Sequence, residues 1–263
     1  MSYALIEKDD SYYDKDKIKV DLMKMHDSNR TMLISDEALT GHHIKTEFPN
    51  RSQIARRLKA AGVSKIIISI RNQVDVLEST YKQYIKSGGV LKVSKFFDLD
   101  DNLNPYFYIN YFNYEKIISL YSKIFGVENV LVIQFEKMLE NKTEFSKRLA
   151  RFLHVENTDF RDALNLPTVN NSLSNFSTKS LRVINHFTYN TFRPSSLIHR
   201  KLSTSLFYKI LKRIDIPKGK NKLIAKYEDE IRTHFAASNA ALIQNYNIKL
   251  HEKYYHTHEA TID

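Results

Sequence analysis

The chain contains no cysteine among its 263 residues. Disulfide frameworks and thiolate chemistry are therefore excluded. No stretch approaches 18 consecutive apolar residues, and the N-terminus lacks the apolar core of a signal peptide. These two absences predict a cytoplasmic protein without a membrane span. Glycine is also scarce, with six residues, and none of them precedes Gly41.

Several motifs that mark enzyme classes are missing as well. The sequence has no Gly-x-Gly-x-x-Gly, no His-Glu-x-x-His and no recognisable serine-hydrolase arrangement. His42 and His43 are adjacent and therefore point apart, while His251, His256 and His258 gather near the C-terminus, where a frayed tail is the simpler interpretation. We therefore expect no metal site.

The charge balance is basic, with 40 Lys and Arg against 30 Asp and Glu and a net charge of +10. Such an excess favours a polyanionic partner, such as a nucleic acid, a nucleotide or an acidic glycan. The basic residues are scattered, however, which weakens the nucleic-acid interpretation. Solvated charge on helix faces remains the alternative. Arg51, Arg56 and Arg57 lie in a predicted helix over 51–61, where they could attract an anionic acceptor, and solvated charge is the role that we expect for them.

Apolar periodicity predicts an α/β protein. Hydrophobic residues make up 42% of the chain and charged residues 27%, as in an ordinary globular protein. Strands alternating with helices predict a mainly parallel sheet with right-handed crossovers. We expect one domain over 1–263, with a loose arm at 1–16, a tail at 247–263 and a helical C-terminal third. The predicted strands are 31–36, 65–70 and 129–136. The predicted helices include 17–27, 51–61, a helix that starts after the change of period at Arg71 and Asn72 and stops at Gly88 and Gly89, 111–125, and a helix after Asn141.

The segment 65–81 predicts an anion site. Four isoleucines in the six residues 65–70 indicate a buried strand, and the period changes at Arg71 to that of a helix. A strand that turns directly into a helix places free backbone N–H groups at the carboxyl edge of the sheet, where anions bind. Arg71 lies at this turn, and Ser79 follows about two helical turns later.

Four stretches then occur in the order found in a known family. They are Met32-Leu-Ile-Ser-Asp-Glu-Ala-Leu-Thr-Gly41, Ile68-Ser-Ile-Arg-Asn-Gln-Val-Asp-Val-Leu-Glu-Ser-Thr-Tyr81, Val130-Leu-Val-Ile-Gln-Phe-Glu136 with Phe152-Leu-His-Val155, and the passage from Ser238 to Tyr255. With them the chain resembles the sulfotransferases, specifically those of bacterial carbohydrate type. The resemblance covers about residues 20–256.

This resemblance implies a three-layer α/β sandwich of the P-loop-NTPase type. It implies 3′-phosphoadenosine-5′-phosphosulfate as the donor, and a hydroxyl or amine of a carbohydrate-type acceptor as the group that receives the sulfuryl. By position, Arg71 and Ser79 would bind the donor's 3′-phosphate, which suits a guanidinium fork and a hydroxyl donor. The alternative is that Arg71 pairs with a carboxylate and that Ser79 has no special role.

The resemblance assigns further roles. Glu37 matches the family's general base, which removes the proton of the acceptor hydroxyl. Two alternatives stay open: Glu37 serves the dipole of a helix start, or the base is the neighbouring Asp36. Asn171 and Ser172 match a donor-binding stretch, with an ordinary Asn/Ser turn as the alternative.

One family element is missing from the sequence. Sulfotransferases begin with a strand and a Gly-x-x-Lys-x-Gly-Thr-Thr loop that holds the phosphosulfate, and no such loop precedes Glu37. Losing one such donor typically costs about 10²–10³ in rate, so the sequence leaves open whether the chain as given catalyses the transfer. A truncated sequence is the favoured interpretation, and a degenerate intact protein is the other.

The alternative function from a different class is a non-catalytic basic protein that binds nucleotides or nucleic acid. The sequence leaves the acceptor and the oligomeric state open.

Overall fold

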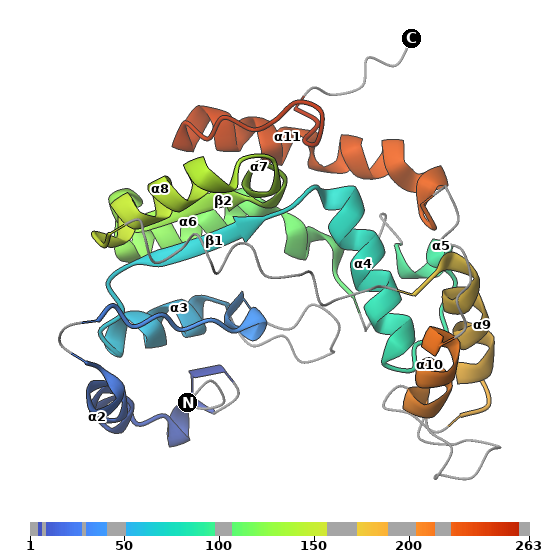
Figure 1. Cartoon of the computed structure of the whole chain (residues 1–263), viewed down its shortest axis with the longest axis horizontal. Coiled ribbons are helices and arrows are strands. Elements are labelled where there is room, and N and C mark those ends of the chain that lie inside the picture. The colour runs from blue at the N-terminus through green and yellow to red at the C-terminus, as the bar shows by residue number, and fades with distance from the viewer. Residues whose placement is uncertain are drawn as a thin grey trace. The chain divides into compact units, whose positions relative to one another are not determined.

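The computed structural model describes residues 5–6, 9–27, 30–40, 51–97, 107–156, 173–188, 204–213 and 222–257 (Figure 1). The chain divides into two compact units. The first unit comprises Met1–Arg71, Asn110–Leu166 and Phe235–Asp263, and the second comprises Asn72–Ile109 and Pro167–His234. In the described ranges, no helix combines the length and apolarity that a membrane crossing requires.

The first unit holds a parallel pair of strands, β1 (Ile66–Ile70) and β2 (Val130–Gln134). Their register places Ile66 beside Val130 and Ile70 beside Gln134. Both strands are rich in β-branched residues, which suit a pleated and buried surface. The parallel arrangement confirms the predicted α/β class, whereas the three-layer sandwich stays a prediction.

Helices surround this pair of strands. Helix α6 packs against both strands, and α3 packs against α6 and α2. Side-chain caps set several helix starts, because Asp14, Asn113 and Asn141 each accept a hydrogen bond from a backbone N–H in the first turn of α2, α6 and α8. The helices of the first unit are α2 (Lys15–Met25), α3 (Arg51–Ala60), α6 (Tyr114–Phe125), α7 (Phe135–Glu140) and α8 (Lys142–Leu153).

The predicted strand over 31–36 is wrong. These residues form no regular secondary structure and pair with neither β1 nor β2. Their exposure alternates, and Leu33 is 65% exposed. An apolar run becomes a strand only where a neighbouring strand accepts its hydrogen bonds, and none does so in the described part of the chain.

The second unit is helical. It contains α4 (Gln73–Lys86), α5 (Val93–Phe96), α9 (Asn175–Asn185) and α10 (Thr204–Arg213), and it includes the first residues of α11 (Glu228–Tyr246). Helix α9 packs against α4 and α10. The Asn185 amide crosses this contact and donates to the carbonyls of Ile85 and Gly89, at 2.8 Å each.

Aromatic rings form the core beside α4. Tyr84 is fully buried, and its ring lies 4.7 Å from that of Phe96. The Tyr84 hydroxyl accepts the backbone N–H groups of Val90 and Leu91 at 3.1 and 3.3 Å. Gly89 lies directly against this ring, since a Cβ at that position would stand 2.2 Å from Tyr84 Cε1. The end of α4 and the turn after it are thus folded around one tyrosine.

Candidate functional site

Arg71 lies at the carboxyl end of β1, as predicted. Because Ile70 is in register with Gln134, the next residues of the two strands, Arg71 and Phe135, follow at the same edge. The Arg71 guanidinium carbon lies 5.1 Å from the centroid of the Phe135 ring. This contact holds a cation over an aromatic face without using its hydrogen-bond donors.

Tyr114 fixes the backbone of Arg71. The Arg71 N–H donates to the Tyr114 hydroxyl at 3.3 Å, and that hydroxyl donates to the Arg71 carbonyl at 2.6 Å. Tyr114 stands at the first position of α6 and is 7% exposed. Burial raises the pKa of Tyr114, so the phenol stays neutral and keeps both roles over the working pH range.

A second buried tyrosine, Tyr255, forms a hydrogen bond with the carboxylate of Glu136. Tyr255 donates to Glu136 Oε2 at 2.8 Å, and the two residues are 1% and 9% exposed. Burial, followed by the charge of Glu136, raises the pKa of Tyr255. Gln134 ties the same C-terminal segment to β2, since its amide donates to the Lys249 carbonyl at 2.9 Å.

The Arg71 guanidinium retains its donors. No carboxylate of the described residues lies within ion-pair distance of it, and none of its nitrogens hydrogen-bonds to those residues. The alternative, in which Arg71 pairs with a carboxylate, is therefore not observed among the described residues.

The start of α4 differs from the predicted anion site. Asn72 caps the helix, and its side-chain oxygen accepts the N–H groups of Val74 at 2.9 Å and Asp75 at 3.3 Å. The expectation of free backbone N–H groups is therefore wrong for these two, because the cap occupies them. The Asn before a helix was the signal that could have revealed this.

Ser79 lies on α4 and is exposed. Its hydroxyl forms no hydrogen bond with the described residues. Asp75, four residues earlier, and Glu78 place carboxylates on the same part of the helix, which alone would repel an anion.

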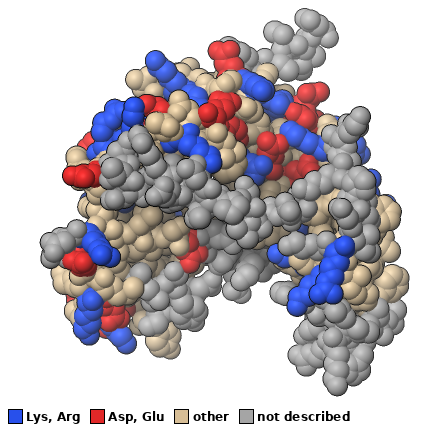
Figure 2. Space-filling model, in the orientation of Figure 1, with Lys and Arg blue, Asp and Glu red and all other residues tan. Residues whose placement is uncertain are grey.

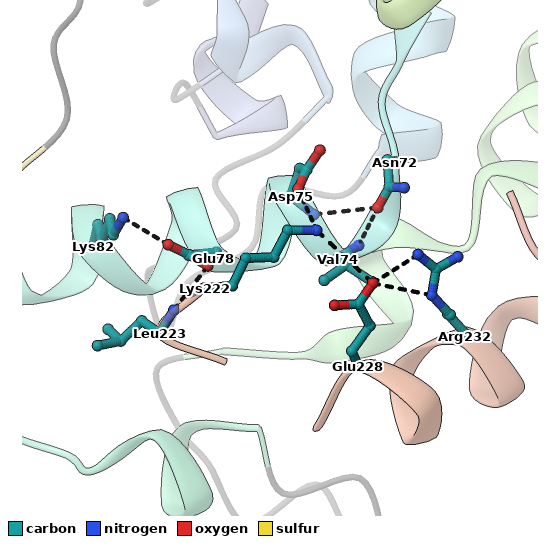
Figure 3. A network of polar contacts seen from close by, with 9 residues as sticks. All are labelled: Asn72, Val74, Asp75, Glu78, Lys82, Lys222, Leu223, Glu228 and Arg232. Atoms are coloured by element: carbon teal, nitrogen blue, oxygen red, sulfur yellow. Dashed lines mark hydrogen bonds and ion pairs between the residues drawn. The ribbon is translucent and has the colours of Figure 1, made fainter. Parts of the chain in front are cut away.

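A network of charged residues compensates those carboxylates (Figure 3). Lys222 Nζ lies 2.9 Å from Asp75 and 3.9 Å from Glu228, and Lys82 Nζ lies 2.6 Å from Glu78. Arg232 pairs with Glu228 at 2.7 Å. Three cations thus face three carboxylates, so the surface of α4 beside Ser79 carries no local excess of negative charge.

For the other predicted site residues, the structure describes the backbone of Glu37 alone. Glu37 begins a 3₁₀ turn, Glu37–Thr40, but its side chain lies outside the described part of the structure, as do Asn171 and Ser172. The end of that turn is held firmly: the Tyr121 hydroxyl donates to the Leu39 carbonyl at 3.0 Å, and Arg51 Nε donates to the Thr40 carbonyl at 2.8 Å.

Two arginines of α3, Arg51 and Arg57, have structural roles. Arg51 stacks on Tyr111, with 3.4 Å from its guanidinium carbon to the ring centroid. Arg57 is 3% exposed and binds Asp10 at 2.7 Å, so the expectation of solvated charge is wrong for it. Its spacing from Ile54 and Ala61 places it on the buried face, a signal that the sequence contained.

Comparison with known proteins identifies the family. A family model described as "Sulfotransferase domain" matches residues 57–229. The solved structure of a sulfotransferase from Alicyclobacillus acidocaldarius is similar over 60% of this chain and 63% of that protein, with 20% identity and a TM-score of 0.36. No curated protein matches. Since the family model spans more than half of its length, the chain belongs to the sulfotransferase domain family.

Proposed function

We propose that this protein transfers a sulfuryl group from 3′-phosphoadenosine-5′-phosphosulfate to a hydroxyl or amine of a carbohydrate-type acceptor. Membership of the sulfotransferase family supports the reaction class. The observation that carries the assignment of the donor is the state of Arg71, whose backbone is fixed by Tyr114 and whose guanidinium has no carboxylate partner among the described residues.

In this proposal Arg71 and Ser79 bind the 3′-phosphate. A guanidinium presents parallel N–H donors that match two phosphate oxygens, and the exposed Ser79 hydroxyl can donate to a third. The balanced charges around Ser79 support this role, because Lys222 and Lys82 offset the carboxylates of Asp75 and Glu78. Asn171 and Ser172 are further proposed donor contacts.

Glu37 is the proposed general base. Its carboxylate takes the proton of the acceptor hydroxyl while the acceptor oxygen forms a bond to sulfur. The sulfur–oxygen bond to the donor's phosphate breaks in the same exchange, and its electron pair stays with that phosphate. The anchoring of Leu39 and Thr40 by Tyr121 and Arg51 supports this role, because a base must be held at a fixed distance from its proton.

Calorimetry with 3′,5′-adenosine bisphosphate tests the donor site. Replacing Arg71 with Ala should weaken binding about 10- to 100-fold, the range expected for a lost charge-assisted contact of about 1.5–3 kcal/mol. The affinity for adenosine 5′-monophosphate, which lacks the 3′-phosphate, should be the same in both proteins. Arg56→Ala, an exposed arginine on α3, is the matched control. Equal bisphosphate affinity in wild type and Arg71→Ala would remove Arg71 from the site.

A transfer assay separates catalysis from binding. Bisphosphate binding that depends on Arg71, without sulfuryl transfer to any carbohydrate acceptor, would favour the non-catalytic nucleotide-binding alternative. A nucleic-acid role has less support, because Lys and Arg lie interspersed with Asp and Glu over the upper part of the face in Figure 2.

A further inference from the structure

Glu136 is the carboxylate that follows the strand beside Arg71. By the register of β1 with β2, Arg71 and Phe135 leave the two strands at the same edge, and Glu136 is the next residue along the chain. The Arg71 guanidinium carbon lies 5.1 Å from the centroid of the Phe135 ring. After burial, the charges of Glu136 and Arg71 act in opposite directions on the pKa of Tyr114, which lies beside both. Glu136 is thus the natural partner for the Arg71 guanidinium.

No ion pair joins these two described residues. Glu136 Oε2 instead accepts the Tyr255 hydroxyl at 2.8 Å, and both side chains of this bond are buried. A buried carboxylate is stable only where a cation or hydrogen-bond donors satisfy it. Tyr255 supplies such a donor, and its bond leaves the guanidinium of Arg71 without the neighbouring carboxylate.

Tyr255 is held in place from both sides. Before it, the Gln134 amide donates to the Lys249 carbonyl at 2.9 Å, and the Gln134 side-chain oxygen accepts the His251 N–H at 3.2 Å. After it, the Asn239 amide of α11 donates to the carbonyl of the next residue at 2.9 Å. Gln134 and Asn239 are both buried. The phenol therefore stays directed at its carboxylate.

We propose that Tyr255 is a positioning residue, whose hydroxyl withholds Glu136 from Arg71 and so keeps the guanidinium open to a phosphate group. Without this hydroxyl, Glu136 turns to Arg71 and competes with the phosphate for the same N–H donors. The role of the phosphate rests on the proposed function, whereas the choice of Glu136 between Tyr255 and Arg71 does not.

Nuclear magnetic resonance of the Arg71 side chain tests this choice without any ligand. In Tyr255→Phe, the new ion pair with Glu136 should shift the Arg71 Nε–Hε resonance and slow its exchange with water. The double variant Tyr255→Phe/Glu136→Gln should return both to the wild-type values, because an amide carries no charge. Arg71→Lys identifies the resonance. An Arg71 resonance that is the same in wild type and Tyr255→Phe would overturn the proposal.

Calorimetry with 3′,5′-adenosine bisphosphate tests the consequence for binding. Tyr255→Phe should weaken binding about tenfold if the ion pair forms in about nine molecules of ten, since apparent affinity scales with the fraction that is competent to bind. Tyr255→Phe/Glu136→Gln should regain the wild-type affinity, and Tyr255→Phe should cause no further loss in an Arg71→Ala background. Tyr254→Phe is the matched control, because Tyr254 donates to the exposed Glu140, and its affinity should be unchanged.

The double variants separate positioning from a purely structural role of Tyr255. A loss of affinity that persists in Tyr255→Phe/Glu136→Gln, or that adds to the loss in Arg71→Ala, would mean that Tyr255 only supports the fold and would overturn the proposal. If the wild-type protein does not bind the bisphosphate, the donor assignment is wrong, and the Arg71 resonance alone decides whether Tyr255 withholds Glu136.

Discussion

Tyr255 donates a hydrogen bond of 2.8 Å to Glu136, and this bond joins two residues that are 119 positions apart. The carboxylate lies in the first turn of α7, directly after β2. Both side chains are almost fully removed from water. The bond therefore fastens the C-terminal segment to the edge of the strands where Arg71 lies.

Replacing Tyr255 with Phe should destabilise the protein by about 1–3 kcal/mol, because a buried carboxylate loses a donor that water cannot easily replace. Urea unfolding measures the effect. Tyr254→Phe is the matched control, since Tyr254 donates to Glu140 at 3.0 Å in an exposed position and its loss should cost less than about 0.5 kcal/mol. Equal losses in the two variants would contradict a larger contribution of the buried bond.

Tyr114→Phe should weaken the binding of 3′,5′-adenosine bisphosphate severalfold, because the Arg71 backbone loses both of its hydrogen bonds to the phenol. The comparison is Tyr121→Phe on the same helix, where burial raises the tyrosine pKa to about 12 and the hydroxyl donates to Leu39. Both variants should lose stability, by about 1 kcal/mol or more. A fall in affinity in both, or in neither, would contradict a specific role of Tyr114 in placing Arg71.

Asn72→Ala should lower the free energy of unfolding by about 0.5–2 kcal/mol, because α4 loses the cap on Val74 and Asp75. Asn72→Asp should retain most of the stability, since a carboxylate accepts the same bonds and suits the helix dipole. Chemical denaturation distinguishes the two. If Asn72→Asp lowers the free energy of unfolding as much as Asn72→Ala does, the helix cap is not the reason why Asn72 stabilises the protein.

Stability should fall as the pH drops below about 7, in part because of His234. Burial lowers the pKa of His234 below its ordinary value of 6.5, so near and below that value the unfolded chain binds a proton that the native protein resists. The stability linked to His234 is therefore present above 6.5 and is lost as the pH falls toward the native pKa.

Urea titrations at several pH values measure this slope. His234→Gln should flatten it between pH 7 and 5, whereas His26→Gln, at an exposed position after α2, should leave it unchanged. An unaltered slope in His234→Gln would assign the pH dependence to other groups.

Local signals explain the parts of the structure that sequence reasoning predicted. The change of period at Arg71 located the end of β1 and the start of α4. Val74, Leu77 and Tyr81, which recur at helical spacing after it, are all buried. A helix does begin after Asn141, as predicted, and Asn141 accepts the N–H of Glu144 at 3.0 Å. Such features depend on a few neighbouring residues, and a sequence displays them directly.

The features that were missed depend on partners far away in the chain. The run at 32–34 is as apolar as β1, yet it forms no strand, because strand formation needs a neighbour that sequence does not reveal. The predicted strand over 129–136 ends at Gln134, where α7 begins. No local sequence pattern predicts the hydrogen bond between Tyr255 and Glu136. The proposed donor site was thus predictable at Arg71, whereas the tyrosines around it were not.

The contact between Gly89 and the Tyr84 ring has a consequence for the evolution of this protein. Any side chain at position 89 would collide with the ring. Loss of the Tyr84 hydroxyl would leave the N–H groups of Val90 and Leu91 without the acceptor that they have now. Neither residue can change first without damage, so natural variants should keep both or replace both. We therefore expect Gly89 and Tyr84 to be retained together or replaced together where this family diverges.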